Sequence, residues 1–186
     1  MPKVIAIVGS PRKGGNTETL TAEALKAIAE EGIETELITL AGKNIQHCDG
    51  CLTCTKTGKC HIEDDLQPIF DKMIKADGII LASPVYVSAV SSQMTALIDR
   101  TAWAARGGLL QNKVGGPIVV GRRAGHNFTF AQLLLFFFNR GIIVPGASYW
   151  TVGFGREKGE VAKDEEAIRH VKSFAKKVAW LIKKLK

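Results

Sequence analysis

Residues 3–17 read KVIAIVGSPRKGGNT, and this stretch decides the fold class. Its first six residues form a short apolar run that Gly9 ends, which is typical of a strand buried in a parallel sheet. Residues 16–31 follow with apolar side chains at a helical spacing. We expect Asn16 or Thr17 to cap the start of this helix, because short polar side chains satisfy the first backbone N–H groups.

The same alternation of strand and helix continues along the rest of the chain. Apolar or alternating runs predict further strands at residues 34–40, 78–82, 117–120 and 142–144. Apolar residues at helical spacing predict further helices at residues 64–76, 91–105, 128–139 and 164–185. This alternation predicts a doubly wound α/β fold, in which helices cover both faces of a five-stranded parallel sheet. Residues 42–63 have no clear periodicity and carry all four cysteines, so we expect a cysteine-rich loop insertion there.

The chain of 186 residues has the length of one domain, and we expect residues 1–186 to form it. Lysines of the last predicted helix contribute much of the net charge of +7. Lysines on one polar helix face are usually solvated, so we expect no nucleic-acid partner. An acidic redox partner would also suit such a surface.

No apolar run has the length of a secretory signal or a bilayer span. Residues 4–8 are too few for a secretory apolar core, and residues 133–138 are too few to cross a membrane. We therefore expect a cytoplasmic protein without a membrane partner. Cysteines stay reduced in the cytoplasm, so four clustered cysteines indicate metal or redox chemistry rather than structural disulfides.

The loop after the first strand carries groups that can hold a phosphate. Its glycines let the backbone wrap closely around a ligand, and the first N–H groups of the next helix point toward that ligand. Ser10, Asn16 and Thr17 add neutral hydrogen-bond donors. Arg12 adds a planar charged fork. The alternative is a plain turn that only opens the helix.

The spacing of this loop narrows the kind of phosphate. Gly9 and Gly14 have the Walker A spacing, but Gly15 stands where that motif needs a lysine. The G-x-G-x-x-G spacing of dinucleotide-binding loops is also missing, since Ser10 and Pro11 follow Gly9. A terminal monophosphate held by amides and hydroxyls remains.

Two further strand-end loops should share this site, because ligands bind beyond the carboxyl ends of parallel strands. In the loop at residues 83–88, Pro84 fixes the backbone and Tyr86 offers a flat ring with a polar tip. The alternative for this loop is a plain connection with Tyr86 in the core. In the loop at residues 121–127, Arg122 and Arg123 could close over a planar, anionic ligand.

Taken together, the three loops resemble those of the NAD(P)H-dependent FMN reductase superfamily, whose fold is flavodoxin-like. The resemblance implies a flavin-dependent oxidoreductase that holds FMN without a covalent bond. It implies that the phosphate is bound by Ser10, Arg12, Asn16 and Thr17. It implies that the isoalloxazine ring is held by Pro84, Val85, Tyr86 and Val87. We place Gly15 and Arg123 in the same FMN site.

The four cysteines follow the spacing C-x2-C-x2-C-x5-C, at Cys48, Cys51, Cys54 and Cys60. Soft thiolates this close in sequence can converge on one iron–sulfur cluster or on zinc, and bare thiols are the third alternative. The first three cysteines resemble the cluster-binding run of bacterial ferredoxins. The last gap is longer than in that run and His61, not proline, follows the last cysteine, which favours one self-contained cluster.

This cysteine spacing inside an FMN-binding fold resembles the iron–sulfur flavoprotein family. The resemblance implies a [4Fe-4S] cluster that passes single electrons to FMN, a ferredoxin-like donor and a homo-oligomer, either a dimer or a tetramer. The alternative is an FMN or quinone reductase without a cluster that takes NAD(P)H as substrate, since such enzymes carry similar cysteines followed by an acidic pair like Asp64-Asp65. A regulatory module that binds flavin or zinc is the non-enzymatic alternative. We identify no catalytic acid or base, which fits a site whose chemistry belongs to its cofactors.

The run of leucine and phenylalanine at residues 133–138 lies on a predicted helix and is apolar on all sides. Such a helix must be covered on all sides, and the sheet can cover only one of them. A second subunit is the natural cover for the rest. The alternative is cover by the cysteine loop or the last helix of the same chain.

Overall fold

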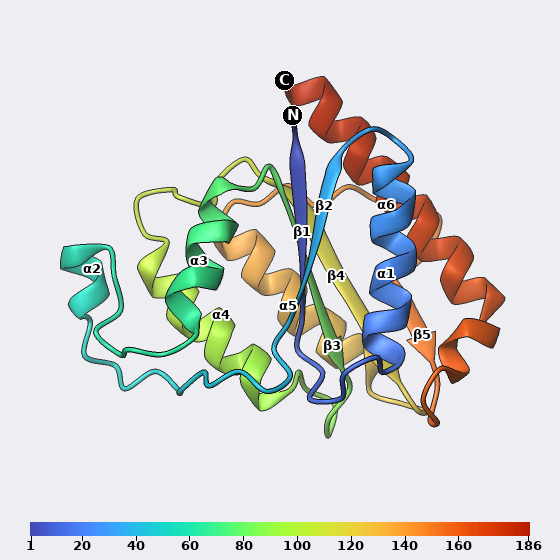
Figure 1. Ribbon diagram of the computed structural model, residues 1–186, viewed down its shortest axis with the longest axis horizontal. Coiled ribbons are helices and arrows are strands. Elements are labelled where there is room, and N and C mark those ends of the chain that lie inside the picture. Colours follow the sequence, from blue (N-terminus) through green and yellow to red (C-terminus); the bar gives the residue numbers. More distant parts are fainter.

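The computed structural model describes residues 1–186, in which strands alternate with helices (Figure 1). Five strands pair in parallel in the order β2-β1-β3-β4-β5. They are β1 (Lys3–Val8), β2 (Glu34–Thr39), β3 (Gly78–Pro84), β4 (Val114–Gly121) and β5 (Val152–Phe154). The predicted five-stranded parallel sheet is therefore confirmed.

Helices cover both faces of the sheet, as predicted. They are α1 (Asn16–Ala29), α2 (Thr53–Thr57), α3 (Leu66–Lys75), α4 (Ser92–Ala104), α5 (His126–Asn139), the 3-10 helix η1 (Glu160–Lys163) and α6 (Glu165–Leu185). Figure 1 shows α1 and α6 together on one face and α3, α4 and α5 on the other. The central strands divide their side chains between the two layers: Ile5 and Ile7 pack toward α3–α5, and Ala6 packs toward α1 and α6. Burial on both faces explains why these strands read as continuous apolar runs.

The prediction of a last strand at residues 142–144 is wrong. Ile143 forms only an isolated bridge with Val114, and the fifth strand lies at Val152–Phe154. Pro145 follows residues 142–144 and offers no backbone N–H group, so this segment cannot continue along β4. The true strand is three residues long and only partly buried, so it lacks the apolar run that marks the others.

Several predicted boundaries and caps also differ from the structure. Strand β3 continues through Ser83 and Pro84, where the sequence suggested a stop. Strand β4 begins at Val114, before the predicted start at residue 117. The prediction missed these residues because Gly115 and Gly116 interrupt the apolar run. Neither Asn16 nor Thr17 caps α1: its N-cap is Gly15, which makes no side-chain cap bond. The predicted cysteine loop contains one short helix, α2.

The apolar run on α5 is only partly covered within the chain. Leu133, Phe136 and Phe137 are buried, but Leu135 is 66% exposed and Phe138 is 82% exposed. The cysteine loop and the last helix therefore do not cover these two side chains, and that alternative is wrong for them. None of the helices combines the length and the apolar character that a membrane span requires.

Candidate functional site

A cavity of about 300 Å³ opens at the carboxyl ends of the strands. The loops that follow β1, β3, β4 and β5 all contribute to its walls. The predicted ligand residues that line it are Ser10, Arg12, Gly15, Asn16, Thr17, Pro84, Val85 and Tyr86. Val87 and Arg123 are not among the lining residues, and the side chain of Val87 is fully exposed.

Five lining residues are not among those that the resemblance assigns to the FMN site. They are Val120, Gly121, Arg122, Gly155 and Arg156. Gly121 and Arg122 belong to the loop at residues 121–127, which the sequence predicts at this site. Gly155 and Arg156 follow β5 directly. Because the last strand was predicted at residues 142–144, this fourth strand-end loop was not predicted.

The loop after β1 holds its shape through contacts within itself. The Arg12 N–H donates to Ser10 Oγ at 3.2 Å, and the Gly15 N–H donates to the Arg12 carbonyl oxygen at 3.2 Å. Gly14 has a φ of 62°, in the left-handed region that favours glycine. The first N–H groups of α1 have no partner inside the helix, so this curled loop presents donors to an anion in the cavity.

The side chain of Asn16 fastens the loop after β5 to the loop after β1. Its Nδ2 donates to the Glu157 carbonyl oxygen at 2.8 Å, and the Val161 N–H donates to its Oδ1 at 3.3 Å. The sequence suggested that this amide would serve a phosphate. In the structure it joins the two loops, and the second of them carries Arg156 to the cavity.

Three arginines give the cavity a positive charge. Arg12, Arg122 and Arg156 line it, and none of its lining residues is acidic. Guanidinium groups bind phosphate oxygens through charge-assisted hydrogen bonds. The arrangement therefore suits an anionic group that extends from the α1 N-terminus across the strand ends.

The loop after β3 ends in a tight hairpin that carries Tyr86. Its N–H donates to the Ala89 carbonyl oxygen at 2.9 Å, and the Ala89 N–H donates back to the Tyr86 carbonyl oxygen at 3.0 Å. Between them, Val87 and Ser88 have φ values of 50° and 60°. A left-handed β-branched residue is an outlier, and such strain persists where the surrounding structure holds a loop for function.

The hairpin and the loop after β4 lie too close for a larger residue at Gly121. A Cβ atom there would lie 2.7 Å from His126 Nε2 and 2.9 Å from Val85 Cγ2. Glycine therefore allows β4 to pack closely against His126 and Val85. Val85, Tyr86 and Gly121 all line the cavity beside this contact, where the edge of a planar ring could lie.

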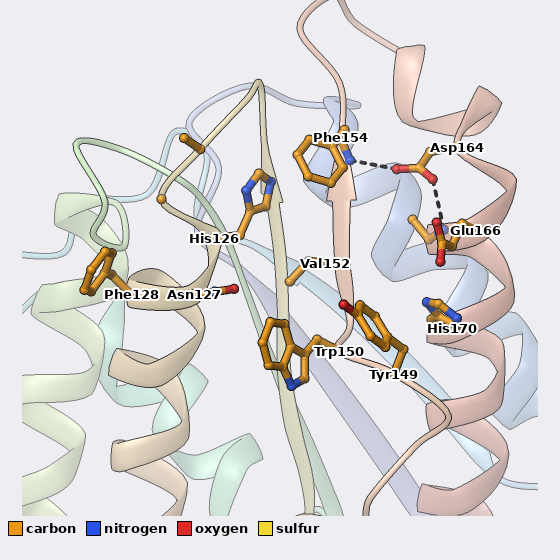
Figure 2. Close-up of a pocket in the computed structure, with 13 residues that line it drawn as sticks. His126, Asn127, Phe128, Tyr149, Trp150, Val152, Phe154, Asp164, Glu166 and His170 are labelled. Carbon is orange, nitrogen blue, oxygen red and sulfur yellow. Dashed lines mark hydrogen bonds between the residues drawn. The ribbon is translucent and has the colours of Figure 1, made fainter.

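A larger cavity, of about 460 Å³, lies between α5, β5 and α6 (Figure 2). No residue predicted to bind a ligand lines it. Figure 2 shows aromatic side chains on both sides, with the rings of His126 and Phe154 in contact at a centroid distance of 4.3 Å. The Asp164 carboxylate accepts the Phe154 N–H at 2.9 Å and the Ala167 N–H at 3.0 Å, so it serves the start of α6.

The structure brings the four cysteines together in a small pocket on the side of the α3–α5 layer. Cys48, Cys51, Cys54 and Cys60 all line it, and none is in a disulfide. Burial raises the pKa of the Cys54 thiol, and the charges of the other three thiols raise that pKa further. The four cysteine side chains therefore share one pocket.

The backbone of residues 46–62, which we call the cysteine segment, turns sharply several times. Gly50, Leu52 and Gly58 have φ values of 73°, 59° and 71°, all in the left-handed region. Leu52 starts α2, which carries Cys54, and Gly58 ends it. These turns let thiols that are spread along the segment point into one pocket.

Two exposed side chains, Asp49 and His61, contact each other beside the thiols and link the two ends of the cysteine run. His61 Nε2 lies 2.6 Å from Asp49 Oδ2, and the Cys51 N–H donates to Asp49 Oδ1 at 3.1 Å. The Cys51 N–H, the Cys51 side chain and His61 together lower the pKa of Asp49 to about 2. The ligand atoms of Asp49, Cys51 and His61 lie within 4.8 Å of one another, so this corner of the segment could also hold a metal ion such as zinc.

Helix α4 connects the two sites. At its start, Ser91 Oγ donates to the Gly9 carbonyl oxygen at 2.6 Å, and Ser83 Oγ accepts the Ser91 N–H at 3.0 Å. Nine residues later, Arg100 lines the cysteine pocket. At 1.5 Å per residue, the helix spans about 13 Å between these two positions.

Comparisons with known proteins agree on the family. The family model described as NADPH-dependent FMN reductase matches residues 2–157. An iron-sulfur flavoprotein of Methanocaldococcus jannaschii is 46% identical over 191 residues, which cover 99% of each chain. An iron-sulfur flavoprotein of Archaeoglobus fulgidus is 35% identical, over 98% of each chain. A flavodoxin, WrbA-like protein of Agrobacterium tumefaciens shares the fold, with a TM-score of 0.71 at 16% identity over the whole of both chains.

Proposed function

Because the chain belongs to the NADPH-dependent FMN reductase family and, within it, to the iron–sulfur flavoproteins, we propose that it passes electrons between a [4Fe-4S] cluster and FMN. The protein is a flavin-dependent oxidoreductase. The four cysteines would hold the cluster, and the cavity at the strand ends would hold the FMN. We further propose that it works in the cytoplasm, where its thiols stay reduced.

The strand-end cavity supports the assignment of FMN to that place. The α1 N-terminus and Arg12 would bind the phosphate, and Arg122 and Arg156 would add positive charge beside it. Tyr86 and Gly121 both line the cavity, so the isoalloxazine ring could lie between the Tyr86 hairpin and the end of β4.

The main support for a cluster is the position of four free thiols in one pocket. All four line one pocket and none is in a disulfide, which supports a four-thiolate ligand set. The cluster supplies one-electron steps and FMN can collect two electrons. Lys56 and Lys59 are exposed on the same segment, so an acidic, ferredoxin-like donor would be attracted to it.

The colour of anaerobically purified protein tests this function directly. We expect brown protein from which heat releases FMN, as identified by its mass. Yellow protein that contains FMN but no iron would contradict the cluster. It would support the second candidate, a reductase that takes NAD(P)H and transfers hydride to FMN or a quinone, which the family description favours.

Arg12→Ala should weaken FMN binding by about 1.5–3 kcal/mol, because it removes a charge-assisted hydrogen bond to the phosphate. The measurement is the dissociation constant of FMN from the apoprotein, followed by flavin fluorescence. Arg123→Ala is the matched control, since that arginine does not line the cavity. Equal weakening in both variants would mean that general charge, and not a phosphate contact, accounts for the loss.

The exposed apolar residues of α5 support a homo-oligomer, either a dimer or a tetramer. We expect Leu135→Asp combined with Phe138→Asp to produce a monomer, because both side chains are exposed in the isolated chain and a buried charge there would be unpaired. Sedimentation at micromolar concentration measures the change. Leu185→Asp serves as the control, because this leucine is exposed at the end of α6. Wild-type protein that already sediments as a monomer would contradict the proposal.

A further inference from the structure

We propose that Arg100 holds together the two ends of the cysteine segment and places a fixed positive charge beside its thiolates. This charge raises the reduction potential of the cluster that the thiolates hold. Arg100 is thus a positioning residue that also tunes the bound group. The inference rests on the proposed function, because it takes an iron–sulfur cluster as the occupant of the cysteine pocket.

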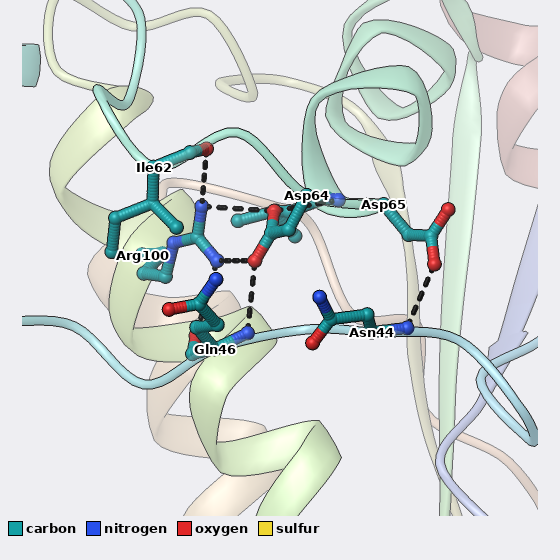
Figure 3. A network of polar contacts seen from close by, with 7 residues as sticks. Asn44, Gln46, Ile62, Asp64, Asp65 and Arg100 are labelled. Atoms are coloured by element: carbon teal, nitrogen blue, oxygen red, sulfur yellow. Dashed lines mark hydrogen bonds and ion pairs between the residues drawn. The ribbon is translucent and has the colours of Figure 1, made fainter.

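Arg100 lies on α4 and forms a fully buried ion pair with Asp64 (Figure 3). The side chains of the two residues are 1% and 0% exposed. Nη1 donates to Asp64 Oδ2 at 2.5 Å and Nη2 donates to Asp64 Oδ1 at 3.1 Å. The contact is therefore bidentate, which fixes the orientation of the guanidinium plane.

The same guanidinium binds both ends of the cysteine segment. Nη1 donates to the Gln46 carbonyl oxygen at 3.0 Å, and Nη2 donates to the Ile62 carbonyl oxygen at 3.3 Å. Gln46 lies two residues before Cys48, and Ile62 lies two residues after Cys60. Asp64 strengthens this link between the two ends, because its Oδ2 accepts the Gln46 N–H at 2.8 Å. Figure 3 shows the two chain segments held on either side of the pair.

The ion pair is oriented with its positive member toward the cysteines. Arg100 lines the cysteine pocket, whereas Asp64 does not. Asp64 occupies both Nη atoms, and the buried Nε atom has no hydrogen-bond partner.

A positive charge in this place favours the reduced cluster. Four thiolates make a ligated cluster anionic, and each added electron makes it more so. A guanidinium that is shielded from water interacts with that added charge more strongly than Lys56 or Lys59, whose charges are exposed and screened by salt. Burial, charge and hydrogen bonding are the means by which a protein sets the potential of such a cluster.

Stability alone does not account for this ion pair. A buried pair is often no more stabilising than apolar residues of the same volume, because both ions lose their hydration. This pair instead bonds two backbone carbonyl groups that lie at the ends of the cysteine segment. Its geometry therefore points to the shape of the segment and to the charge beside the thiols.

Two variants separate the positioning role from the charge. Arg100→Lys keeps a positive charge but loses the fork that joins Gln46 to Ile62. The double variant Asp64→Asn/Arg100→Gln removes both charges together, so no buried ion is left unpaired and the fold should survive. Arg106→Gln is the matched control, because Arg106 is exposed and stacks on Trp103, at 4.2 Å from its ring, beside the same pocket.

Each variant is prepared anaerobically and reconstituted with iron and sulfide, and its FMN content reports a correct fold. Iron per chain and the cluster potential, from a redox titration followed by electron paramagnetic resonance, are then measured. We expect the double variant to shift the reduction equilibrium at least tenfold toward the oxidised cluster, which is about 59 mV for one electron. We expect Arg100→Lys to keep a potential near that of the wild type but to lose its iron faster to a chelator.

Unchanged potential and iron retention in both variants would overturn the role of Arg100 while the cluster stands. A shift of equal size in Arg106→Gln would also overturn it, because any nearby charge would then have the same effect. Reconstituted wild-type protein without iron would instead overturn the proposed function itself, and the role of Arg100 with it.

Discussion

Cys54→Ala is expected to remove most of the iron from anaerobically prepared protein and to leave its FMN in place. Under the proposed function, wild-type protein should carry about four irons and four labile sulfides per chain, which is the content of one [4Fe-4S] cluster. Cys54 lies on α2 and lines one pocket with the other three cysteines. Its replacement by alanine would leave the cluster with three of its four thiolate ligands. The FMN should remain, because no cysteine lines the strand-end cavity.

Electron transfer should divide in the same way. Reduction of the flavin by a one-electron donor should fall sharply in Cys54→Ala, whereas direct reduction by NAD(P)H should survive. Thr55→Ala is the matched control, because Thr55 neighbours Cys54 on the same short helix and its hydroxyl donates only to the Leu52 carbonyl oxygen, at 2.8 Å. Wild-type protein that holds FMN without iron or sulfide after reconstitution would establish the simple reductase in place of the cluster protein.

Local sequence signals predicted most of the strand-end site. Each of the loops after β1, β3 and β4 follows an apolar run and carries glycine or proline, and that combination marks a strand end without any knowledge of the tertiary structure. The fourth loop was missed because β5 has three residues and only Gly153 among them is buried. Its position depends on pairing with β4, which is a long-range contact that no local pattern encodes.

Asn16 illustrates a second limit of the sequence. Its position at the start of α1 correctly placed it at the cavity, but its side-chain partners lie more than 140 residues away in the chain. An amide that can serve a ligand can equally serve a backbone group. Only the fold decides which of these partners it meets.

The cysteine segment shows the same division. The spacing of the cysteines predicted that they converge, because the segment is short and contains glycines that allow sharp turns. The ion pair beneath it was not predicted, since Asp64 and Arg100 are 36 residues apart. One signal was present: Arg100 is a charged residue among the buried side chains Leu97, Thr101 and Ala104 of α4, which is rare without a buried partner.

Asp64→Ala is expected to destabilise the protein by about 3–5 kcal/mol, because it leaves the buried Arg100 charge without its partner. It also removes the acceptor of the Gln46 and Leu66 N–H groups, which Asp64 binds at 2.8 and 3.0 Å. Urea unfolding of the FMN-loaded protein measures the loss. Asp65→Ala is the matched control: this neighbouring carboxylate is exposed and accepts only the Asn44 N–H, at 2.7 Å, so about 1 kcal/mol is expected.

The pH dependence of the same pair of proteins gives a second test. Burial alone would raise the pKa of Asp64, but Arg100 and the two backbone N–H groups lower it below its usual value. A lowered pKa in the folded state means that Asp64 stabilises the protein fully above its unfolded pKa of about 3.9 and less as the pH falls through the folded value. The difference between wild type and Asp64→Ala should therefore be constant near neutral pH and shrink in acid. A difference that stays the same down to the lowest pH at which the wild type folds would mean that the lost packing of Asp64, and not its charge, accounts for the effect.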